Sequence, residues 1–466
     1  MKISLACTAL FAAAGFLVNA APNPSPQILG SNSGIIGLLP NTPISPVSEI
    51  LTPPLDIAFT PSTLKPKKLI YTWTGADDRH HKDFLATFSG DDDTFGTLID
   101  VTTVPTSGNE PHHIGVSVDG NTIIGGGLLS LLKLQDTAYY FDISNKWRPR
   151  FKKSNRAVLS SIVDEVRAKP DGGFFITYMG SAAGTAPGRL VETDKDFNII
   201  GEHPQDLSQI DILFPNFNPH GLAIDFERNV ILTSDFAVPL TTLKPTTGVV
   251  YDSTVRVWDL AKRSITNTIN LPNGGGIQDV KFIPGNKQGL AVATAVGTGD
   301  IWIIDPHTKD AQGKPGVATL LYAFGSEYAN KNAIYTEISK DGKFLYLTIT
   351  SAHRVAVLDI SNPFAAKRVD DPNVPQPIVG PHYLKLTPDG KQLIITDYFV
   401  RQGALGVLNT AADYKLWAID VNPATGALSF KKSIDFQTTF KWIGGARPHS
   451  SAYYDSTWKG EGDAYL

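Results

Sequence analysis

The fold is decided by residues 111–127, PHHIGVSVDGNTIIGGG, because this stretch holds a strand, a turn and a second strand that the chain then repeats. Apolar residues alternate with polar or small ones up to Val118, the pair Asp119-Gly120 follows, and a second apolar run comes next. Alternation with a period of two predicts a half-buried strand, and Asp-Gly is a strong hairpin signal. A third strand, AYYFDIS, follows at 138–144. The unit is therefore predicted to be an antiparallel meander.

The chain repeats this unit at intervals of roughly 50 residues, which is typical of β-propeller blades. Five further copies begin with VDEVRAKPDGGFFITYMG (163–180), PHGLAIDFERNVILTSD (219–235), IQDVKFIPGNKQGLAVAT (277–294), IYTEISKDGKFLYLTIT (334–350) and PHYLKLTPDGKQLIITD (381–397). A seventh copy begins with ARPHSSAYY at 446–454 but has too little chain after it to complete a blade.

The N-terminal strands KLIYTWTG (68–75) and DFLATFSG (83–90) can complete that seventh blade. Closing the ring through both termini would remove the exposed sheet edges of an open array. The sequence thus predicts an all-β protein, a single seven-bladed β-propeller closed by its N- and C-terminal strands, with six blades as the alternative.

The N-terminal region carries a targeting signal in this interpretation. Residues 1–20 have one lysine, a short apolar stretch and small residues at the end, as in a cleaved signal peptide. A membrane anchor is the alternative, but the apolar stretch is short and APNPSP follows at once. We expect a secreted protein, an extended Pro/Ser/Asn-rich arm over 21–67, and the propeller domain over 68–466.

Composition limits the chemistry and the partners. The net charge is −4, with no basic tail, so we expect no nucleic-acid partner, and no stretch after the signal could span a membrane. The single cysteine, Cys7, lies in the signal segment, so a mature chain would have no disulfide and no thiolate.

Four histidines follow a proline at equivalent places in the repeats: His112, His220, His382 and His449. The first strand of a propeller blade lines the central channel, so these positions are predicted to form a ring at one mouth of the channel. The preceding proline restricts the backbone and so limits how far each imidazole can move. His113 lies beside the ring. The alternative is that proline merely starts strands and histidine suits a polar channel.

Neutral imidazoles without cysteine suit iron, copper or zinc, and the same ring without metal would supply general acids and bases near neutral pH. The candidate catalytic residues are His112, His113, His220, His382 and His449, and the possible metal ligands are His112, His220, His382 and His449. Four further polar residues are candidates for substrate binding: Arg447, Tyr398, Asp164 and Glu337. The carboxylates could instead orient imidazoles or form hydrogen bonds between blades.

Several stretches resemble the selenium-binding protein and methanethiol oxidase family of seven-bladed propellers, from about Lys68 to the C-terminus. They include NEPHHIGVS (109–117), STVRVWDLAKRSITNTINL (253–271), SKDGKFLYLTITSAHRVAVLDISNP (339–363) and GPHYLKLTPDGKQLIITDYF (380–399). The resemblance implies copper binding, and it points to His112, His113, His353 and His449. The paired cysteines of that family are absent from residues 114–127, which argues against selenium or thiol chemistry at a cysteine.

A secreted, cysteine-poor propeller of this size is also similar to the fungal hetero-Diels–Alderases of tropolonic sesquiterpenoid pathways. That resemblance implies dehydration of a hydroxymethyl tropolone to an ortho-quinone methide and its cycloaddition to a terpene alkene such as humulene. Such an enzyme needs an acid, donors for the tropolone oxygens and an apolar wall, and it requires no cofactor.

Three hypotheses about function follow. The first is this pericyclase acting on a hydrophobic or polyphenolic small molecule. The second is a copper or iron oxidase with histidine ligands, of the methanethiol oxidase kind. The third is a non-catalytic ligand-binding propeller. The sequence does not give the oligomeric state.

Overall fold

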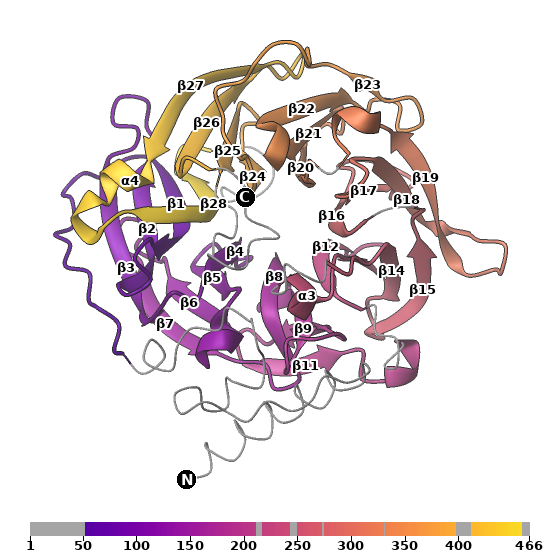
Figure 1. Ribbon diagram of the computed structural model, residues 1–466, viewed down its shortest axis with the longest axis horizontal. Coiled ribbons are helices and arrows are strands. Elements are labelled where there is room, and N and C mark those ends of the chain that lie inside the picture. Colours follow the sequence, from indigo (N-terminus) through magenta and orange to yellow (C-terminus); the bar gives the residue numbers. More distant parts are fainter. Residues whose placement is uncertain are drawn as a thin grey trace, which may run out of the picture.

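Seven four-stranded antiparallel sheets form a closed ring in the computed structural model of the chain (Figure 1). The structure describes residues 52–210, 217–242, 249–272, 275–329, 331–397 and 412–458. Seven blades confirm the prediction and exclude the six-bladed alternative. Residues 1–51, which include the expected signal peptide and most of the expected arm, lie outside the described residues.

The blades follow the sequence repeats, and within each sheet the strands succeed one another from the channel outward. The first blade contains β28 (Ala446–Asp455), β1 (Lys68–Ala76), β2 (Lys82–Ser89) and β3 (Leu98–Ser107), and the second contains β4 (Pro111–Val116), β5 (Thr122–Gly127), β6 (Ala138–Asp142) and β7 (Arg150–Asn155). The third contains β8 (Ser160–Ala168), β9 (Phe174–Ser181), β10 (Arg189–Thr193) and β11 (Ile199–His203), and the fourth contains β12 (Pro219–Asp225), β13 (Val230–Asp235), β14 (Thr254–Asp259) and β15 (Ser264–Asn270).

The remaining three blades repeat the same order. The fifth contains β16 (Ile277–Phe282), β17 (Ala291–Ala295), β18 (Ile301–Lys309) and β19 (Pro315–Tyr322), and the sixth contains β20 (Ala333–Ile338), β21 (Phe344–Ile349), β22 (Arg354–Asp359) and β23 (Lys367–Arg368). The seventh contains β24 (Leu384–Leu386), β25 (Gln392–Thr396), β26 (Lys415–Val421) and β27 (Leu428–Asp435).

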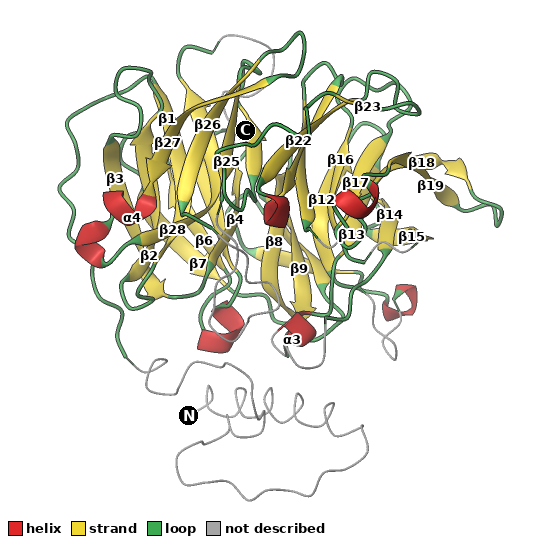
Figure 2. Cartoon of the chain, turned by 45° about the horizontal axis from the view of Figure 1, so that its top comes forward, coloured by secondary structure: helices red, strands yellow, loops and turns green. Residues whose placement is uncertain are grey.

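Helices within the described residues are short connections at the ends of the blades (Figure 2). They are η2 (Ser130–Lys133), η3 (Leu207–Gln209), α3 (Pro239–Thr242), η4 (Gly325–Glu327), η5 (Thr350–Ala352), α4 (Phe436–Thr439) and η6 (Lys441–Ile443). None of the helices that the structure describes is long and apolar enough to cross a membrane.

The ring closes through the first blade, as predicted. β28, from the C-terminal end, pairs antiparallel with β1, and Tyr71 lies opposite Ala452 in the register. β28 is also the innermost strand of that blade, so the C-terminal repeat completes the lining of the channel (Figure 1). Closure gives β1 a hydrogen-bonded neighbour on both sides, β28 and β2.

Apolar side chains pack between neighbouring blades. Trp73 on β1 is fully buried, lies 5.4 Å from the ring of Phe141 and 5.8 Å from that of Tyr139, and donates a hydrogen bond from Nε1 to the carbonyl of Gly126 at 2.7 Å. The indole therefore joins the closing blade to the second one by both packing and a hydrogen bond.

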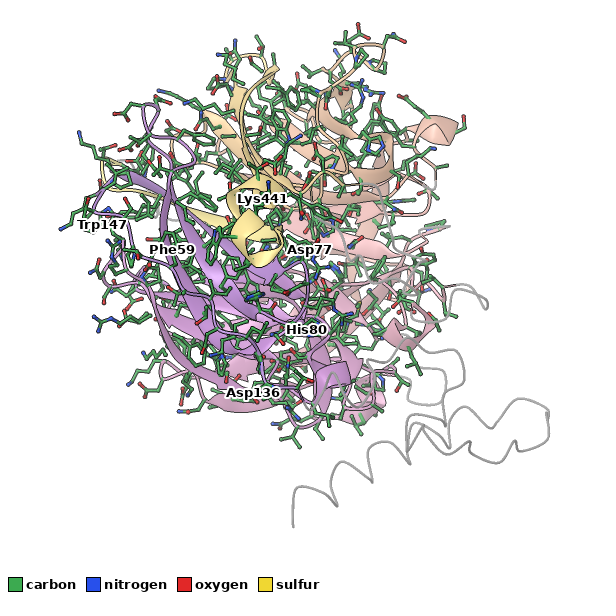
Figure 3. The ribbon with its side chains drawn as sticks, turned by 60° about the vertical axis from the view of Figure 1, so that its left-hand side comes forward. Phe59, Asp77, His80, Asp136, Trp147 and Lys441 are labelled. Carbon is green, nitrogen blue, oxygen red and sulfur yellow. The ribbon has the colours of Figure 1, made fainter. Side chains whose placement is uncertain are left out.

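Residues 52–67 run along the outside of the first blade (Figure 3). Leu55 forms a bridge with His81, and Ser62 donates a backbone hydrogen bond to the carbonyl of Ile99 at 3.0 Å. Phe59 stacks on Trp442 with 6.4 Å between ring centroids. The described end of the expected arm is thus fixed to the propeller surface by specific contacts.

Candidate functional site

The side chains of five histidines meet at one end of the inner strands. His112, His113, His220, His382 and His449 are at most 4% exposed, and we call this group the histidine chamber. The ring of His112 lies 4.4 Å from that of His113 and 4.2 Å from that of His449, and His382 lies 4.7 Å from His449. The structure therefore brings together all five candidate catalytic residues, whose roles stay a prediction.

Irregular strand pairing aims these side chains inward. The register shifts between Pro111 and Ile114 on β4, and between Pro219 and Leu222 on β12. Similar shifts occur on β8, β16 and β20. On β28 the shift falls at His449, which has no partner of its own on β1 in the register. A bulge bends the strand and redirects a side chain, so the shifts account for two successive histidines both being buried in the chamber.

Two carboxyl groups from β8 lie against the imidazoles. Asp164 Oδ2 is 3.1 Å from His220 Nε2, and its Oδ1 is 3.5 Å from His113 Nδ1. Glu165 Oε2 is 3.0 Å from His113 Nδ1, and its other oxygen accepts a hydrogen bond from Arg167. Both carboxyl groups are fully or almost fully buried, so they can fix the ring orientations of the histidines.

Four of the five chamber histidines are held in the neutral form. Burial, and then the proximity of the other histidines, holds the pKa of His112, His382 and His449 well below the usual value, and the same causes act on His220. Burial, followed by the charges of Glu165 and Asp279, raises the pKa of Asp164 well above its usual value. Neutral imidazoles and a protonated carboxyl group therefore share one site.

Glu165 is the ionised group of this set. Burial opposes its ionisation, but the charges of Arg167 and His113 hold the pKa of Glu165 well below its usual value. Glu165 therefore connects the chamber to a guanidinium farther along β8.

Two tyrosines and a glutamine belong to the site although the sequence did not single them out for a role. Tyr335 Oη lies 3.3 Å from His220 Nε2, and Gln278 Nε2 lies 3.2 Å from the same nitrogen. The rings of Tyr335 and Tyr383 each lie 4.9 Å from that of His113. A signal was available, because Tyr335 occupies in the sixth blade the place that His113 takes in the second.

Other candidates lie elsewhere. Arg447 Nη1 is 3.2 Å from Glu110 Oε1 and its Nε is 3.3 Å from Asp77 Oδ1, so two carboxylates already balance its charge. Glu337 pairs with Lys281 at 3.1 Å and lines a cavity at the opposite end of the inner strands. Tyr398 lies outside the described residues.

His353, which the family resemblance indicates as a copper ligand, is exposed. Its Nδ1 accepts a hydrogen bond from the backbone of Gly380 at 3.0 Å, and no ring contact found within the described residues joins it to the chamber.

Asp279 accepts hydrogen bonds from the backbone and hydroxyl of Thr336, at 2.8 and 2.7 Å. Asp279 thus forms a hydrogen bond between the fifth and sixth blades, which is the structural role that the sequence leaves open for carboxylates in the channel.

Two groups of side chains have the spacing to hold a metal ion. His112, His382 and His449 each offer a ring nitrogen, and these atoms lie within 4.8 Å of one another. His112, His113 and Asp164 form a second group, whose ligand atoms also lie within 4.8 Å of one another. Neither group includes His220, the fourth predicted ligand, whose Nε2 faces Asp164, Gln278 and Tyr335.

Gly221 leaves no room for a side chain beside His220. A Cβ at this position would lie 2.5 Å from Ser234 Oγ and 2.8 Å from the backbone nitrogen of Val280. Because the backbone contact cannot move aside cheaply, we expect Gly221→Ala to destabilise the fold by about 1–3 kcal/mol and to displace His220. Urea unfolding measures the first effect. Gly285→Ala, where nothing lies within 4 Å, has its strain only from a positive φ and leaves the chamber unchanged.

The pH dependence of stability follows from the lowered histidine pKa values. In the metal-free protein His449 stays neutral, as do His112, His220 and His382, while the same residue in the unfolded chain binds a proton below about pH 6.5. Each such histidine therefore lowers the free energy of unfolding by about 1.4 kcal/mol per pH unit below that point. We expect the free energy of unfolding, measured with urea at several pH values between 6.5 and 5, to depend less steeply on pH in His449→Gln than in the wild type, by about this amount per pH unit. Equal slopes would mean that His449 is protonated in the fold.

Within its described residues the molecule is thus a closed seven-bladed propeller with a buried, neutral histidine centre in its channel. The family model of the 56 kDa selenium-binding protein matches residues 61–463, so the chain belongs to the selenium-binding protein family. No curated protein matches the chain.

Solved structures support the fold. A hypothetical selenium-binding protein from Sulfolobus tokodaii is 18% identical with a TM-score of 0.67, over 84% of this chain and 94% of that one. The periplasmic gluconolactonase of Pseudomonas aeruginosa is 13% identical with a TM-score of 0.57, over 83% and 98%. A putative 6-phosphogluconolactonase from Bacteroides fragilis is 14% identical with a TM-score of 0.54, over 85% and 100%. Identities this low establish the shared propeller fold alone.

Proposed function

We propose that the protein is a metal-dependent oxidoreductase whose centre is the histidine chamber. The observation that carries this proposal is the group of three buried imidazoles, His112, His382 and His449, whose ring nitrogens lie within 4.8 Å of one another. Their lowered pKa values favour the neutral form, which is the form that binds metal. The donor set therefore fits a metal ion without prior loss of protons.

The kind of metal follows from the ligands. Nitrogen donors without thiolate suit copper or iron, and the expectation of copper or iron from the sequence agrees with this donor set. When bound, such an ion supplies one-electron chemistry and contacts to oxygen or substrate.

The remaining side chains of the chamber support this role. Asp164 Oδ1 lies 3.6 Å from His112 Nδ1, so it can orient that ligand as an outer partner, while Glu165 holds the ring of the neighbouring His113 at 3.0 Å. Tyr335 offers a hydroxyl 3.3 Å from His220 and can hold or transfer a proton there. Burial of the whole group excludes bulk water from the reacting atoms.

Metal loading and turnover test the proposal together. The purified full-length protein is stripped with chelator, reloaded with copper or iron, dialysed and analysed for metal and for oxygen uptake with small thiols and phenols. We expect about one equivalent of retained metal and oxygen uptake that requires it. Retention well below one equivalent for both metals would contradict the proposal.

The hetero-Diels–Alderase hypothesis is a second candidate, and one contact favours it. Asp164 is a buried carboxyl group whose pKa is raised, so it can donate a proton, and it lies 3.1 Å from His220. In that reaction the proton would go to the hydroxymethyl oxygen of a hydroxymethyl tropolone, which leaves as water, and the tropolone ring hydroxyl would return a proton to the Asp164 carboxylate. The ortho-quinone methide formed would then add to the alkene of a terpene such as humulene.

Metal-free protein decides between the candidates. Incubation with a hydroxymethyl tropolone and humulene should give one stereoisomer faster than the enzyme-free mixture, and Asp164→Asn should abolish the difference. Equal rates and isomer ratios with and without protein would exclude this reaction. A bound ligand without turnover in either assay would instead favour the non-catalytic binding hypothesis.

A further inference from the structure

A second site lies in the channel beyond the histidine chamber. The residues two places farther along four inner strands are Arg167, Lys281, Glu337 and Lys385, which follow the positions of Glu165, Asp279, Tyr335 and Tyr383. Side chains at positions i and i+2 of a strand share a face, so these four residues line the channel about 7 Å farther along. They surround a cavity of about 340 Å³, which we call the lysine cavity.

One cation of the lysine cavity has no carboxylate partner. Arg167 pairs with Glu165, and Lys281 pairs with Glu337 at 3.1 Å and with Asp279 at 4.0 Å. Within the described residues no carboxylate oxygen lies within 4.0 Å of Lys385 Nζ, which lies instead 5.6 Å from the ring centre of Tyr383. Lys385 is therefore the cation of the lysine cavity that has no ion pair among the described residues.

Apolar side chains form the rest of the wall. They include Ile114 and Val116 on β4, Val166 on β8 and Phe282 on β16. Phe226, after β12, also lines the cavity and is 39% exposed, so this end of the channel is open to solvent. A volume of this size lies at the lower end of the roughly 300–1,000 Å³ common for small-molecule sites.

We propose that the lysine cavity binds a small organic carboxylate, with its charged group at Lys385 and its apolar body against Ile114, Val166 and Phe282. A single negative charge fits better than a phosphate dianion, because the Glu337 carboxylate lines the same cavity and would repel a second charge. This site is independent of any metal in the histidine chamber.

The surroundings of Lys385 add to the geometric argument. Burial, followed by the positive charge of Lys281, lowers the pKa of Lys385 to about 8, while Glu337 and Glu165 act in the opposite direction and Arg167 adds to the lowering. A bound carboxylate would counter the unfavourable field at Lys385. Binding is thus expected to weaken as the pH rises above about 8, where the free amine loses its proton.

Calorimetric titration of the metal-stripped, full-length protein tests this site. The probe is benzoate at pH 7, and its neutral isostere benzamide is the comparison. We expect benzoate to bind about tenfold more tightly than benzamide, and Lys385→Met to weaken benzoate binding by about tenfold or more. Glu337→Gln removes a negative charge from the cavity wall and leaves Lys281 with Asp279 alone, at 4.0 Å, so it is expected to tighten benzoate binding several-fold.

Matched controls lie on the turn after β20, at the same end of the blade but outside the cavity lining. Lys343 is 57% exposed at its side chain and pairs with Asp341 at 3.0 Å, so Lys343→Met and Asp341→Asn change the same charges there. Both should leave benzoate binding unchanged. The proposal is overturned if benzoate does not bind, if benzamide binds equally well, or if Glu337→Gln fails to tighten binding. Should Lys385→Met not fold, the Glu337→Gln titration alone still decides.

Discussion

His382→Ala is expected to lower the affinity of the protein for copper by more than the 10–100-fold that is typical when an outer partner of a metal ligand is lost. The reason is that His382 supplies one of three ring nitrogens that lie within 4.8 Å of one another, and two imidazoles cannot fix the ion as three do. Competition with a chelator of known affinity measures the change, and metal-dependent oxygen uptake should fall with it.

His353→Ala is the matched control for this variant. It also removes one imidazole, but His353 is exposed and contacts Gly380 rather than the chamber. Copper affinity should therefore stay within a factor of about two of the wild type. If both variants bind copper equally well, the metal site lies outside the histidine chamber.

Trp73→Ala is expected to destabilise the fold by about 3–5 kcal/mol. The substitution would leave a large cavity between the first and second blades and would remove the hydrogen bond to Gly126. The lost contacts belong to β1, the strand that also closes the ring by pairing with β28. Urea unfolding followed by circular dichroism measures the free energy.

Trp442→Ala is the comparison for this prediction. The side chain of Trp442 is 48% exposed and stacks only loosely on Phe59 at 6.4 Å, so its removal should cost less than about 1 kcal/mol. Equal losses for the two variants would show that the interface at Trp73 does not hold the ring closed.

The fold could be predicted from sequence because its determinants are local. Each copy contains an alternating strand and a turn such as Asp119-Gly120, and the incomplete seventh copy at 446–454 required strands from the N-terminal side. The observed pairing of β28 with β1 is the arrangement that this count predicts. Blade number thus follows from the repeats without any knowledge of tertiary contacts.

The site could be predicted only in part. The recurring Pro-His pairs placed four histidines at equivalent positions, and the structure brings their rings together. A period of two gives the face of a side chain only while the strand is regular, whereas the register shifts beside His112 and His220. A similar shift between Val163 and Val166 on β8 brings Asp164 and Glu165 both into contact with the chamber. Alternation alone does not predict this.

Other assignments required distances that no sequence pattern contains. The sequence predicts that Glu337 and Asp164 both face the channel, but the two residues occupy different depths along it. Arg447 directly precedes the Pro448-His449 pair, but its side chain forms ion pairs with Glu110 and Asp77. Position along the channel and prior ion pairs therefore decide which channel residues are available for chemistry.

The most direct test of the metal centre is electron paramagnetic resonance of the copper-loaded protein. We predict nitrogen hyperfine structure from several imidazoles, and its loss in a variant with His112, His382 and His449 all replaced by glutamine. A spectrum of oxygen ligands alone, or a nitrogen pattern unchanged in that variant, would contradict this prediction.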